Sequence, residues 1–374
     1  KRRKTMSETS QTVLEINLNS LSDNYHFLKS KLPEKTKFLG VVKAGAYGND
    51  AISVAQKLQC LGADYLAVAY TQEGVNLRKA GIHLPIMVLH PQKTNFNELI
   101  RFKLEPTLYN DYSLKHFLEV TSKEDCSNYP IHIKFNTGLN RLGFKFNAIE
   151  NICTTLTDNK SIKIESVLSH LAASEDLNEK EFTLKQITDF NIIYDHMASI
   201  IGYSPIKHIC NTSGILNYPE AHFDMVRSGI GLYGFGNSKE YQTKLIPITS
   251  LKSVISQKHI IKAGESIGYN RAFITDKDIS SATIPVGHAD GISRIYGNKK
   301  GFVYIKNQKA PIIGNVCMDM IMVDVSAINC NEGDEVILFD KQFSAALLSE
   351  NAGTISYELI TSISQRISRI IVDN

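Results

Sequence analysis

The sequence lacks a strong excess of charge of either sign. In the 374-residue chain, 41 lysines and arginines face 38 aspartates and glutamates, which leaves a formal net charge of +3. So weak a bias gives no argument for binding to nucleic acid or to a membrane surface. No apolar run is long enough to span a bilayer. The first residues, KRRKTMSETSQT, lack the apolar stretch of a secretory signal, so we expect a cytoplasmic protein.

Paired cysteines are also missing. None of the six cysteines forms a C-x-x-C pair; they are Cys60, Cys126, Cys153, Cys210, Cys317 and Cys330. Neither the spacing of zinc ligands nor a disulfide framework is visible. We therefore expect reduced thiols and no bound metal.

Hydrophobic periodicity indicates the fold of the first two thirds of the chain, where short apolar runs alternate with stretches of helical period. The expected strands are Phe38–Lys43, Tyr65–Ala69, Pro85–Leu89, Glu105–Leu108, Ile131–Phe135, Ile164–Ser169, Ile206–Cys210 and Val226–Leu232. The expected helices include Ile52–Leu61, Gln72–Ala80, Ser113–Val120, Ala148–Leu156 and Lys180–Ile200. About eight such units predict a closed (β/α)8 barrel of parallel strands. An open doubly wound sheet is the alternative, but no G-x-G-x-x-G follows the first strand.

The pattern changes after about residue 240, where short β-rich runs are separated by turn signals. These runs are Leu251–Ile261, Ala282–Val286, Gly301–Ile305, Ile312–Val316, Ile321–Val325 and Glu335–Phe339. A helix is expected over Tyr357–Ile371. We therefore predict an α/β chain with a flexible tail at 1–12, an N-terminal (β/α)8 barrel at 13–240 and a C-terminal mostly-β domain at 241–374.

Polar side chains gather where the predicted strands end, which in a barrel is the face that carries the active site. They are Lys43, Tyr70, His90, Tyr109, Lys134, His170, Asn211 and Arg227. Together they describe a cup lined with cations and aromatic rings. Such a cup suits an anionic ligand, and phosphate is the usual one for this fold.

Two of these strand ends have further features. A lysine at the end of a buried strand loses hydration, which lowers the pKa of its ammonium and makes Lys43 a plausible amine for a Schiff base. After the seventh predicted strand, the run Arg227-Ser228-Gly229-Ile230-Gly231 contains glycines that free backbone N–H groups, which can hold a phosphate. Thr212 and Tyr47 can add hydroxyl donors.

The motif VVKAGAYGND around Lys43 resembles the cofactor-lysine signature of alanine racemases, usually written AVVKANAYGHG. Further blocks resemble that family in the same order: HIKFNTGLNRLGF, SHLAASED, HICNTSG, DMVRSGIGLYG, IGYNRAF, GHADGISR, NVCMDMIMVDV and TISYE. The resemblance runs from about Leu14 to Arg369. It implies a pyridoxal 5′-phosphate enzyme that racemises alanine and supplies D-alanine for peptidoglycan, and a homodimer with shared active sites.

The resemblance also implies a role for each matching residue. Lys43 is similar to the Schiff-base lysine that is the base on one face of the substrate Cα, and Tyr269 is similar to the base on the opposite face. The phosphate and its surroundings would be held by Tyr47, Asn211, Thr212, Gly229, Ile230 and Tyr357. Arg227 resembles the partner of the pyridine nitrogen, and His170 resembles the histidine that supports that end of the ring.

Arg141 resembles the ligand of the cofactor's phenolic oxygen, near the substrate carboxylate, which the backbone N–H of Met318 also reaches. Lys134 resembles a lysine that is often carbamylated in the family, because a carbamate would pair with Arg141 where a bare ammonium would be repelled.

The chain departs from the common pattern at several positions: Gly45 stands for Asn, Asn136 for Asp, Ser228 for Pro, Thr212 for Ser and His288 for Tyr. His288 leaves both catalytic bases in place but opens the question of substrate preference.

Other functions stay open at this stage. A racemase of serine, or of a broader range of amino acids, could use the same scaffold. A barrel decarboxylase usually places a carboxylate against the pyridine nitrogen, where this chain has Arg227, which cannot give up its proton. A non-catalytic carrier of the cofactor would lack the second domain and Tyr269. The chain also resembles the racemase part of a ligase-racemase fusion.

Overall fold

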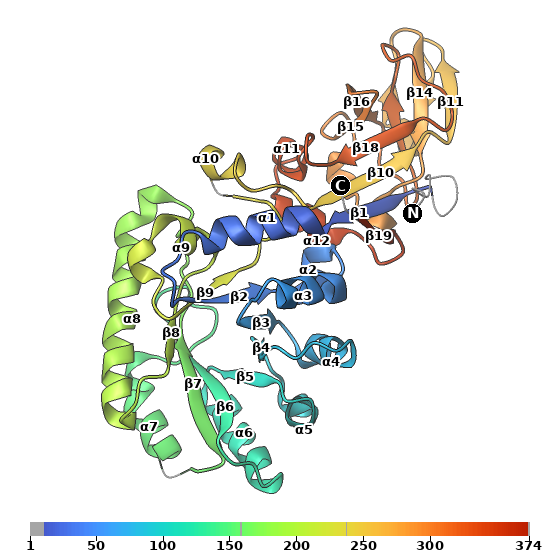
Figure 1. Ribbon diagram of the computed structural model, residues 1–374. Coiled ribbons are helices and arrows are strands. Elements are labelled where there is room, and N and C mark those ends of the chain that lie inside the picture. Colours follow the sequence, from blue (N-terminus) through green and yellow to red (C-terminus); the bar gives the residue numbers. More distant parts are fainter. Residues whose placement is uncertain (1–10, 158, 237, 373–374) are drawn as a thin grey trace.

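The computed structural model describes residues 11–157, 159–236 and 238–372, which form a barrel and a β domain (Figure 1). Eight parallel strands follow one another around the barrel in the order β8-β7-β6-β5-β4-β3-β2-β9. Their bounds are β2 Lys37–Val41, β3 Tyr65–Val68, β4 Ile86–Val88, β5 Glu105–Leu108, β6 Tyr129–Lys134, β7 Ile162–Leu168, β8 Ile206–His208 and β9 Met225–Ser228. Backbone hydrogen bonds from Asp224 N to Lys207 O and from Arg227 N to Cys210 O, both 3.1 Å, join β8 to β9. The predicted barrel is confirmed.

Helices surround the barrel strands (Figure 1). They are α1 Leu18–Lys29, α3 Ala51–Cys60, α4 Thr71–Lys79, α5 Phe96–Arg101, α6 Asp111–Lys123, α7 Ile149–Thr157, α8 Lys180–Ile201 and α9 Thr212–Asn217, with short turns η2 Lys93–Asn95, η3 Phe146–Ala148, η4 Leu177–Glu179 and η5 Pro219–Ala221. Local chemistry sets several ends. Asp50 caps α3 by accepting a hydrogen bond from Ser53 N (2.7 Å), and Gly202, at φ 77°, ends α8. Within the described ranges, no helix is long and apolar enough to cross a membrane.

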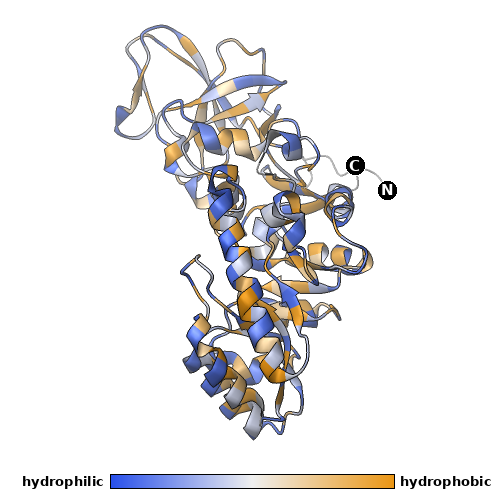
Figure 2. Cartoon of the chain, turned by 90° about the vertical axis from the view of Figure 1, so that its left-hand side faces the viewer, coloured by the Kyte–Doolittle hydropathy of each residue, from blue (hydrophilic) through white to orange (hydrophobic). Residues whose placement is uncertain are grey.

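Side chains of the barrel strands alternate between two apolar clusters. Phe38 and Leu66 pack into the large core beneath the helices, whereas Leu39, Tyr65 and Ala67 belong to a smaller cluster with Met87 and Met225. Since alternate residues of a strand face opposite sides, the smaller cluster fills the barrel interior. The helices close the outer layer with one apolar face each, and Figure 2, viewed from the side of α8, shows hydrophilic and hydrophobic residues alternating along them.

The β domain is built on a nine-stranded sheet with the order β11-β14-β17-β16-β15-β18-β10-β1-β19. The bounds are β1 Val13–Asn17, β10 Thr249–Val254, β11 Gln257–Ile261, β14 Ile279–Ile284, β15 Phe302–Ile305, β16 Gln308–Ile313, β17 Ile321–Asp324, β18 Glu335–Phe339 and β19 Ser368–Val372. The hairpin β12 Ser266–Ile267 and β13 Phe273–Ile274, the helices α10 Lys239–Gln242, α11 Ala345–Asn351 and α12 Ser356–Ser362, and the turns η6 Tyr269–Arg271, η7 His288–Asp290 and η8 Arg294–Tyr296 complete this half. The predicted β-rich second domain is confirmed.

The two ends of the chain differ from the predictions. The range predicted for the barrel began at residue 13, but β1 pairs with β10 and β19 in the sheet of the β domain. The helix predicted over Tyr357–Ile371 ends at Ser362, and its second half is β19, because the β-branched run Ile370–Val372 pairs with β1. Residues 1–10 of the predicted tail lie outside the described residues. Thr12, which also belongs to the predicted tail, is buried, and its hydroxyl donates a hydrogen bond to Pro285 O at 2.7 Å.

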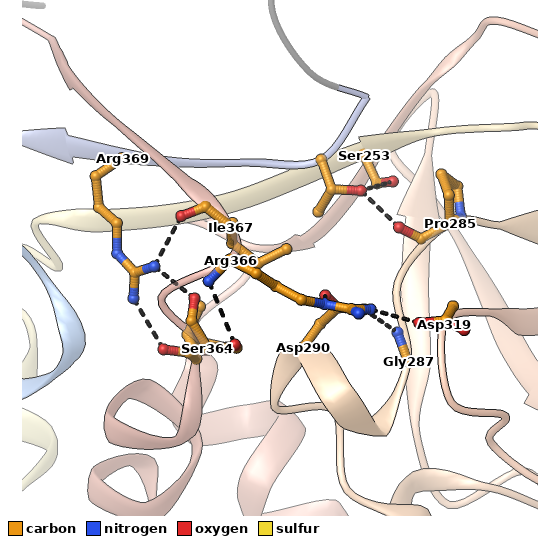
Figure 3. A network of polar contacts seen from close by, with 11 residues as sticks. Ser253, Pro285, Gly287, Asp290, Asp319, Ser364, Arg366, Ile367 and Arg369 are labelled. Carbon is orange, nitrogen blue, oxygen red and sulfur yellow. Dashed lines mark hydrogen bonds and ion pairs between the residues drawn. The ribbon is translucent and has the colours of Figure 1, made fainter.

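A polar network ties the C-terminal segment to the β domain (Figure 3). The guanidinium of Arg366 contacts Asp290 (Nε to Oδ1, 2.6 Å) and Asp319 (Nη2 to Oδ1, 2.7 Å). The second oxygen of Asp290 accepts a hydrogen bond from Gly287 N at 2.8 Å. These bonds fix the loop that carries Asp319 and its neighbour Met318.

Candidate active site

A cavity of about 1020 Å³ opens at the C-terminal ends of the barrel strands. Of the polar residues predicted there, Lys43, Tyr70, His90, Lys134, His170, Asn211 and Arg227 line it. Tyr109 is not among the lining residues, and its ring instead stacks on that of His90 at 5.7 Å. Tyr47, Arg141, Thr212, Gly229, Ile230 and Tyr357 complete the set of predicted residues in this cavity.

Lys43 stands at the start of an unusual turn, α2 (Lys43–Gly48). The residues from Ala44 to Tyr47 all have left-handed backbone angles, with φ between 52° and 64°. This conformation is costly for a residue with a Cβ atom, and such strain is typical of functional sites. Glu73 holds the turn, since its carboxylate accepts hydrogen bonds from Ala44 N (2.6 Å) and from Ala69 N (2.7 Å) at the end of β3.

Cations are crowded around the cavity. Lys43, Lys134, Arg141 and Arg227 line it, and none of them forms an ion pair within the described part of the chain. Burial, with help from Arg141, lowers the pKa of Lys43. Burial and the charges of Arg227 and Arg141 lower the pKa of Lys134 to about 8. An anionic ligand would therefore be stabilised in this site.

The guanidinium of Arg227 is buried and held on several sides. Its Nη1 donates to His208 Nδ1 at 2.6 Å, and its Nη2 donates to Ser169 O at 2.7 Å and to His170 Nδ1 at 3.2 Å. Burial and the nearby Arg227 hold the pKa of His170 well below its usual range, so this ring is a neutral acceptor. Among the described residues no hydrogen bond engages Arg227 Nε, which leaves that N–H for a ligand in the cavity.

Another part of the cavity forms a cradle of hydroxyl and backbone groups. A Cβ atom on Gly229 would lie 2.3 Å from the Tyr47 hydroxyl, so only glycine allows this close approach. The Tyr47 ring is fixed by stacking on Tyr233 at 4.7 Å. Thr212 shares a hydrogen bond with Ser228 (3.0 Å), and its Oγ1 accepts one from Gly231 N (3.3 Å).

Asn211 and Tyr357 flank this cradle. The Asn211 side chain caps α9 by accepting from Gly214 N at 2.9 Å, so it shapes the loop. Tyr357 approaches from α12 of the β domain, with its ring 6.1 Å from that of Tyr47. Burial raises the pKa of Tyr47 to about 12, so its hydroxyl keeps its proton and can donate.

Tyr269 and Met318 are not part of this cavity. They line a separate open depression of about 610 Å³ on the β domain, together with Cys317 and Asp319. The side chain of Tyr269 is 68% exposed and that of Met318 is 58% exposed. His288 lies beside them, because its N–H donates to Cys317 O (3.0 Å). A single chain thus gathers eleven predicted site residues in one place and these two in another.

Sequence reasoning missed several residues of the cavity. Glu73 resembles an ordinary first-turn acid of a helix, and only the fold shows that it clamps the turn after Lys43. His208, the acceptor of Arg227, sits inside a strand with no motif to mark it. Glu175 and Glu358 also line the cavity. The one available signal was strand alternation, which places His208 on the inward face.

Comparison with known proteins gives a consistent result. The family model described as "Alanine racemase, N-terminal domain" matches residues 16–236, and that described as "Alanine racemase, C-terminal domain" matches residues 248–371. The alanine racemase of Syntrophobacter fumaroxidans is 38% identical over 361 residues, covering 94% of each chain.

Solved structures agree. The alanine racemase of Clostridium difficile 630 superimposes with a TM-score of 0.91 at 34% identity, covering 98% of this chain and 97% of that one. The alanine racemase of Bartonella henselae, with covalently bound pyridoxal phosphate, gives a TM-score of 0.89 at 28% identity and covers 97% of this chain and all of its own.

Proposed function

The chain belongs to the alanine racemase family, and on that premise we propose that it interconverts L-alanine and D-alanine with pyridoxal 5′-phosphate as cofactor. The observation that carries the proposal is the single cavity in which Lys43, on its left-handed turn, faces a glycine-lined cradle and a locked guanidinium. The resemblance further implies that the D-alanine formed in the cytoplasm supplies peptidoglycan.

The cavity suits the cofactor at both ends. The space that a Cβ atom of Gly229 would fill is left open beside the Tyr47 hydroxyl, and Thr212, Ile230 and Tyr357 surround it, as a phosphate site requires. The free Nε–H of Arg227 can donate to the pyridine nitrogen, with His170 supporting the guanidinium. Lys43 would hold the cofactor covalently. When bound, the cofactor withdraws electrons and stabilises the negative charge left when the substrate loses its Cα proton.

Racemisation needs one group on each face of the substrate Cα. We assign Lys43 Nζ to one face, since its lowered pKa makes an unprotonated amine accessible. Tyr269 Oη serves the other face. Because Tyr269 lines a separate depression in its own chain, we propose a homodimer in which each β domain covers the partner's barrel.

Arg141 and Lys134 act at the substrate side. Arg141 would hold the cofactor's phenolic oxygen near the substrate carboxylate, which the backbone N–H of Met318 of the partner subunit would also reach, because Met318 does not line the barrel cavity of its own chain. We propose that Lys134 is carbamylated: its neutral amine adds to carbon dioxide, a new N–C bond forms and one proton is released. The carbamate pairs with Arg141 and removes one of the crowded positive charges.

The proposal is tested by incubating the protein and cofactor with single L-amino acids and measuring the D-enantiomer by chiral chromatography. We expect D-alanine, and loss of this activity in Lys43→Ala. Borohydride reduction should attach the cofactor to the peptide that contains Lys43. Release of carbon dioxide with no D-enantiomer would instead indicate a decarboxylase.

One observation favours a second candidate substrate. His288 stands where many members carry Tyr, and it lies beside the loop of Cys317 and Met318. Its imidazole can exchange hydrogen bonds with a hydroxyl group. L-serine therefore belongs in the same assay, and a higher kcat/KM for serine than for alanine would make this chain a serine racemase on the same scaffold.

A further inference from the structure

A chain of four hydrogen bonds runs through the barrel interior to Arg227. Arg227 Nη1 contacts His208 Nδ1 at 2.6 Å, and His208 Nε2 contacts Ser166 Oγ at 2.9 Å. Ser166 Oγ contacts His132 Nδ1 at 2.7 Å, and His132 Nε2 contacts the carboxylate of Glu105 at 2.9 Å. His132, Ser166 and His208 are fully buried.

The topology explains this chain. His132 pairs in register with Ser166, and Leu168 pairs with His208 two residues further along β7. Ile131, Ile133 and Val167 alternate with these residues and pack outward under the helices. The polar side chains of this hydrogen-bond chain come from β5 to β9 and share the barrel interior with an apolar cluster, to which β7 and β9 also contribute Leu168 and Met225.

With both imidazoles neutral, only one direction of donation satisfies every link. A guanidinium has donors alone, so His208 must accept on Nδ1 and, as a neutral ring, must donate from Nε2 to Ser166. Ser166 then has its single proton left for His132 Nδ1. His132 accordingly carries its proton on Nε2 and donates it to Glu105. All donors point from the cation of Arg227 toward the anion of Glu105.

The ends of the chain carry opposite charges, although they are not in contact. A buried charge is costly unless it is compensated, and Arg227 forms no ion pair within the described residues. Glu105 is the carboxylate that terminates its hydrogen bonds. Burial and the nearby charge of Glu105 raise the pKa of Tyr65, and the charge of Arg78 also interacts with Glu105. Burial and Arg227 hold the pKa of His208 well below its usual range, which keeps that ring neutral.

We propose that Glu105, His132, Ser166 and His208 are positioning residues that hold the Arg227 guanidinium in one orientation, with its Nε–H directed at the bound cofactor. Linked hydrogen bonds that all donate in one direction polarise one another, and each is stronger for it. The orientation of a group at the active site thus depends on a carboxylate at the other end of the barrel interior. The inference rests on the proposed function, because the cofactor gives Arg227 its task.

Removal of the central hydroxyl tests the proposal. We expect Ser166→Ala to lower kcat for alanine racemisation about 10-fold, as loss of a group that orients a ligand does elsewhere, with little change in KM. The absorption spectrum of the bound cofactor should shift. Ser166→Thr, which keeps the hydroxyl, should restore both. Ser253→Ala is the matched control, since Ser253 is also a fully buried strand serine and its hydroxyl bonds Thr12.

A merely structural role predicts another result. It would lower the stability of Ser166→Ala and Ser253→Ala alike and leave the spectrum and kcat of the folded protein unchanged, which would overturn the proposal. If Ser166→Ala does not fold, Glu105→Gln replaces it, because Glu105 reaches the barrel rim with its side chain 12% exposed. Glu105→Gln removes the negative charge at the end of the hydrogen-bond chain but keeps the size of the side chain. We expect it to lower kcat less than about 10-fold, with a spectral shift in the same direction.

A direct readout needs no activity. In protein labelled with ¹⁵N-histidine and free of cofactor, the rings of His208 and His132 should both show the tautomer with the proton on Nε2, and His208 should keep it across neutral pH because its pKa is held low. A proton on Nδ1 of either ring would reverse the deduced direction and overturn the proposal. If the wild-type protein racemises no amino acid while the histidines are as deduced, the proposed function fails and the hydrogen-bond chain stands.

Discussion

Lys134 shows how much a single residue depends on its surroundings. Its amine is largely buried and faces Arg227, Arg141 and Lys43, and these conditions lower its pKa from 10.5 to about 8. A depressed lysine pKa means that the folded state binds the proton less tightly than the unfolded state. The protein therefore bears the full penalty of the buried ammonium below pH 8 and loses it as the pH rises toward 10.5.

This leads to a prediction about carbon dioxide. In buffer free of bicarbonate, the thermal midpoint of unfolding should rise between about pH 8 and 10.5. With bicarbonate present, the carbamate removes the ammonium, so the midpoint at pH 8 should be higher and its rise with pH smaller. Differential scanning fluorimetry measures both curves. Lys134→Gln is the control, because it should lose the bicarbonate effect. Equal curves with and without bicarbonate in the wild-type protein would contradict the carbamate.

Single residues could be predicted where a motif or a strand end marked them. Lys43, Arg227 and Gly229 were found this way, and all three line the cavity. Ser166 and His208 were not found, because a serine or a histidine within a strand has no local signal. Their importance comes from partners 42 and 19 residues away along the chain, which only the folded barrel brings together.

At the scale of elements, the left-handed turn α2 is the least expected feature. Alanine and tyrosine disfavour positive φ, so Ala44, Ala46 and Tyr47 give no signal for such a turn. The turn is stabilised by contacts with other elements, namely the hydrogen bond from Ala44 N to Glu73 and the packing of Gly48 on α12. The backbone of Gly48 packs so closely on Ile360 that a Cβ atom would lie 2.0 Å from the Ile360 carbonyl oxygen.

The two glycines of the turn should therefore respond differently to substitution. Gly48→Ala adds a Cβ atom where none fits, at φ +85°, and should lower the free energy of unfolding by about 2 kcal/mol or more. It should also weaken cofactor binding, because α12 carries Tyr357. Gly45→Asn is the matched control: its nearest neighbour is 3.7 Å away and asparagine tolerates left-handed angles, so we expect a change below about 1 kcal/mol. Urea unfolding and cofactor titration measure both effects, and equal losses in the two variants would contradict this account of the turn.

Most elements followed from periodicity, and the exceptions have a common cause. The eight barrel strands and the long helix α8 are governed by local apolar patterns, which the sequence displays. Strands β1 and β19 pair with each other across almost the whole chain, so their place in one sheet depends on contacts that no local pattern records. A helical period over Tyr357–Ile371 was outweighed by that pairing.

At the scale of the whole molecule, the β domain presents predicted site residues on two different surfaces. One face brings Tyr357 of α12 against the barrel cavity of the same chain. The other presents Tyr269 and Met318 in an open depression with no barrel residue in its lining. Sequence motifs name the residues of both sites but carry no information on which chain completes which. The open depression is the structural reason to expect a second copy.

The last prediction tests that arrangement by mixing subunits. A phenol is a weak base at neutral pH, so Tyr269 needs the cationic cavity of a barrel to act on a proton, and it does not line the cavity of its own barrel. Lys43→Ala and Tyr269→Phe should each be nearly inactive alone. If sites are shared, a mixed dimer has one site with both substitutions and one with neither, so equal mixing should restore about a quarter of wild-type activity. If both bases came from one chain, every site of a mixed dimer would carry one substitution and activity would stay near zero. Subunit exchange is confirmed separately with differently tagged chains. The Lys43→Ala protein mixed with itself is the baseline, and a mixed dimer no more active than that baseline would refute the shared site while leaving the family assignment intact.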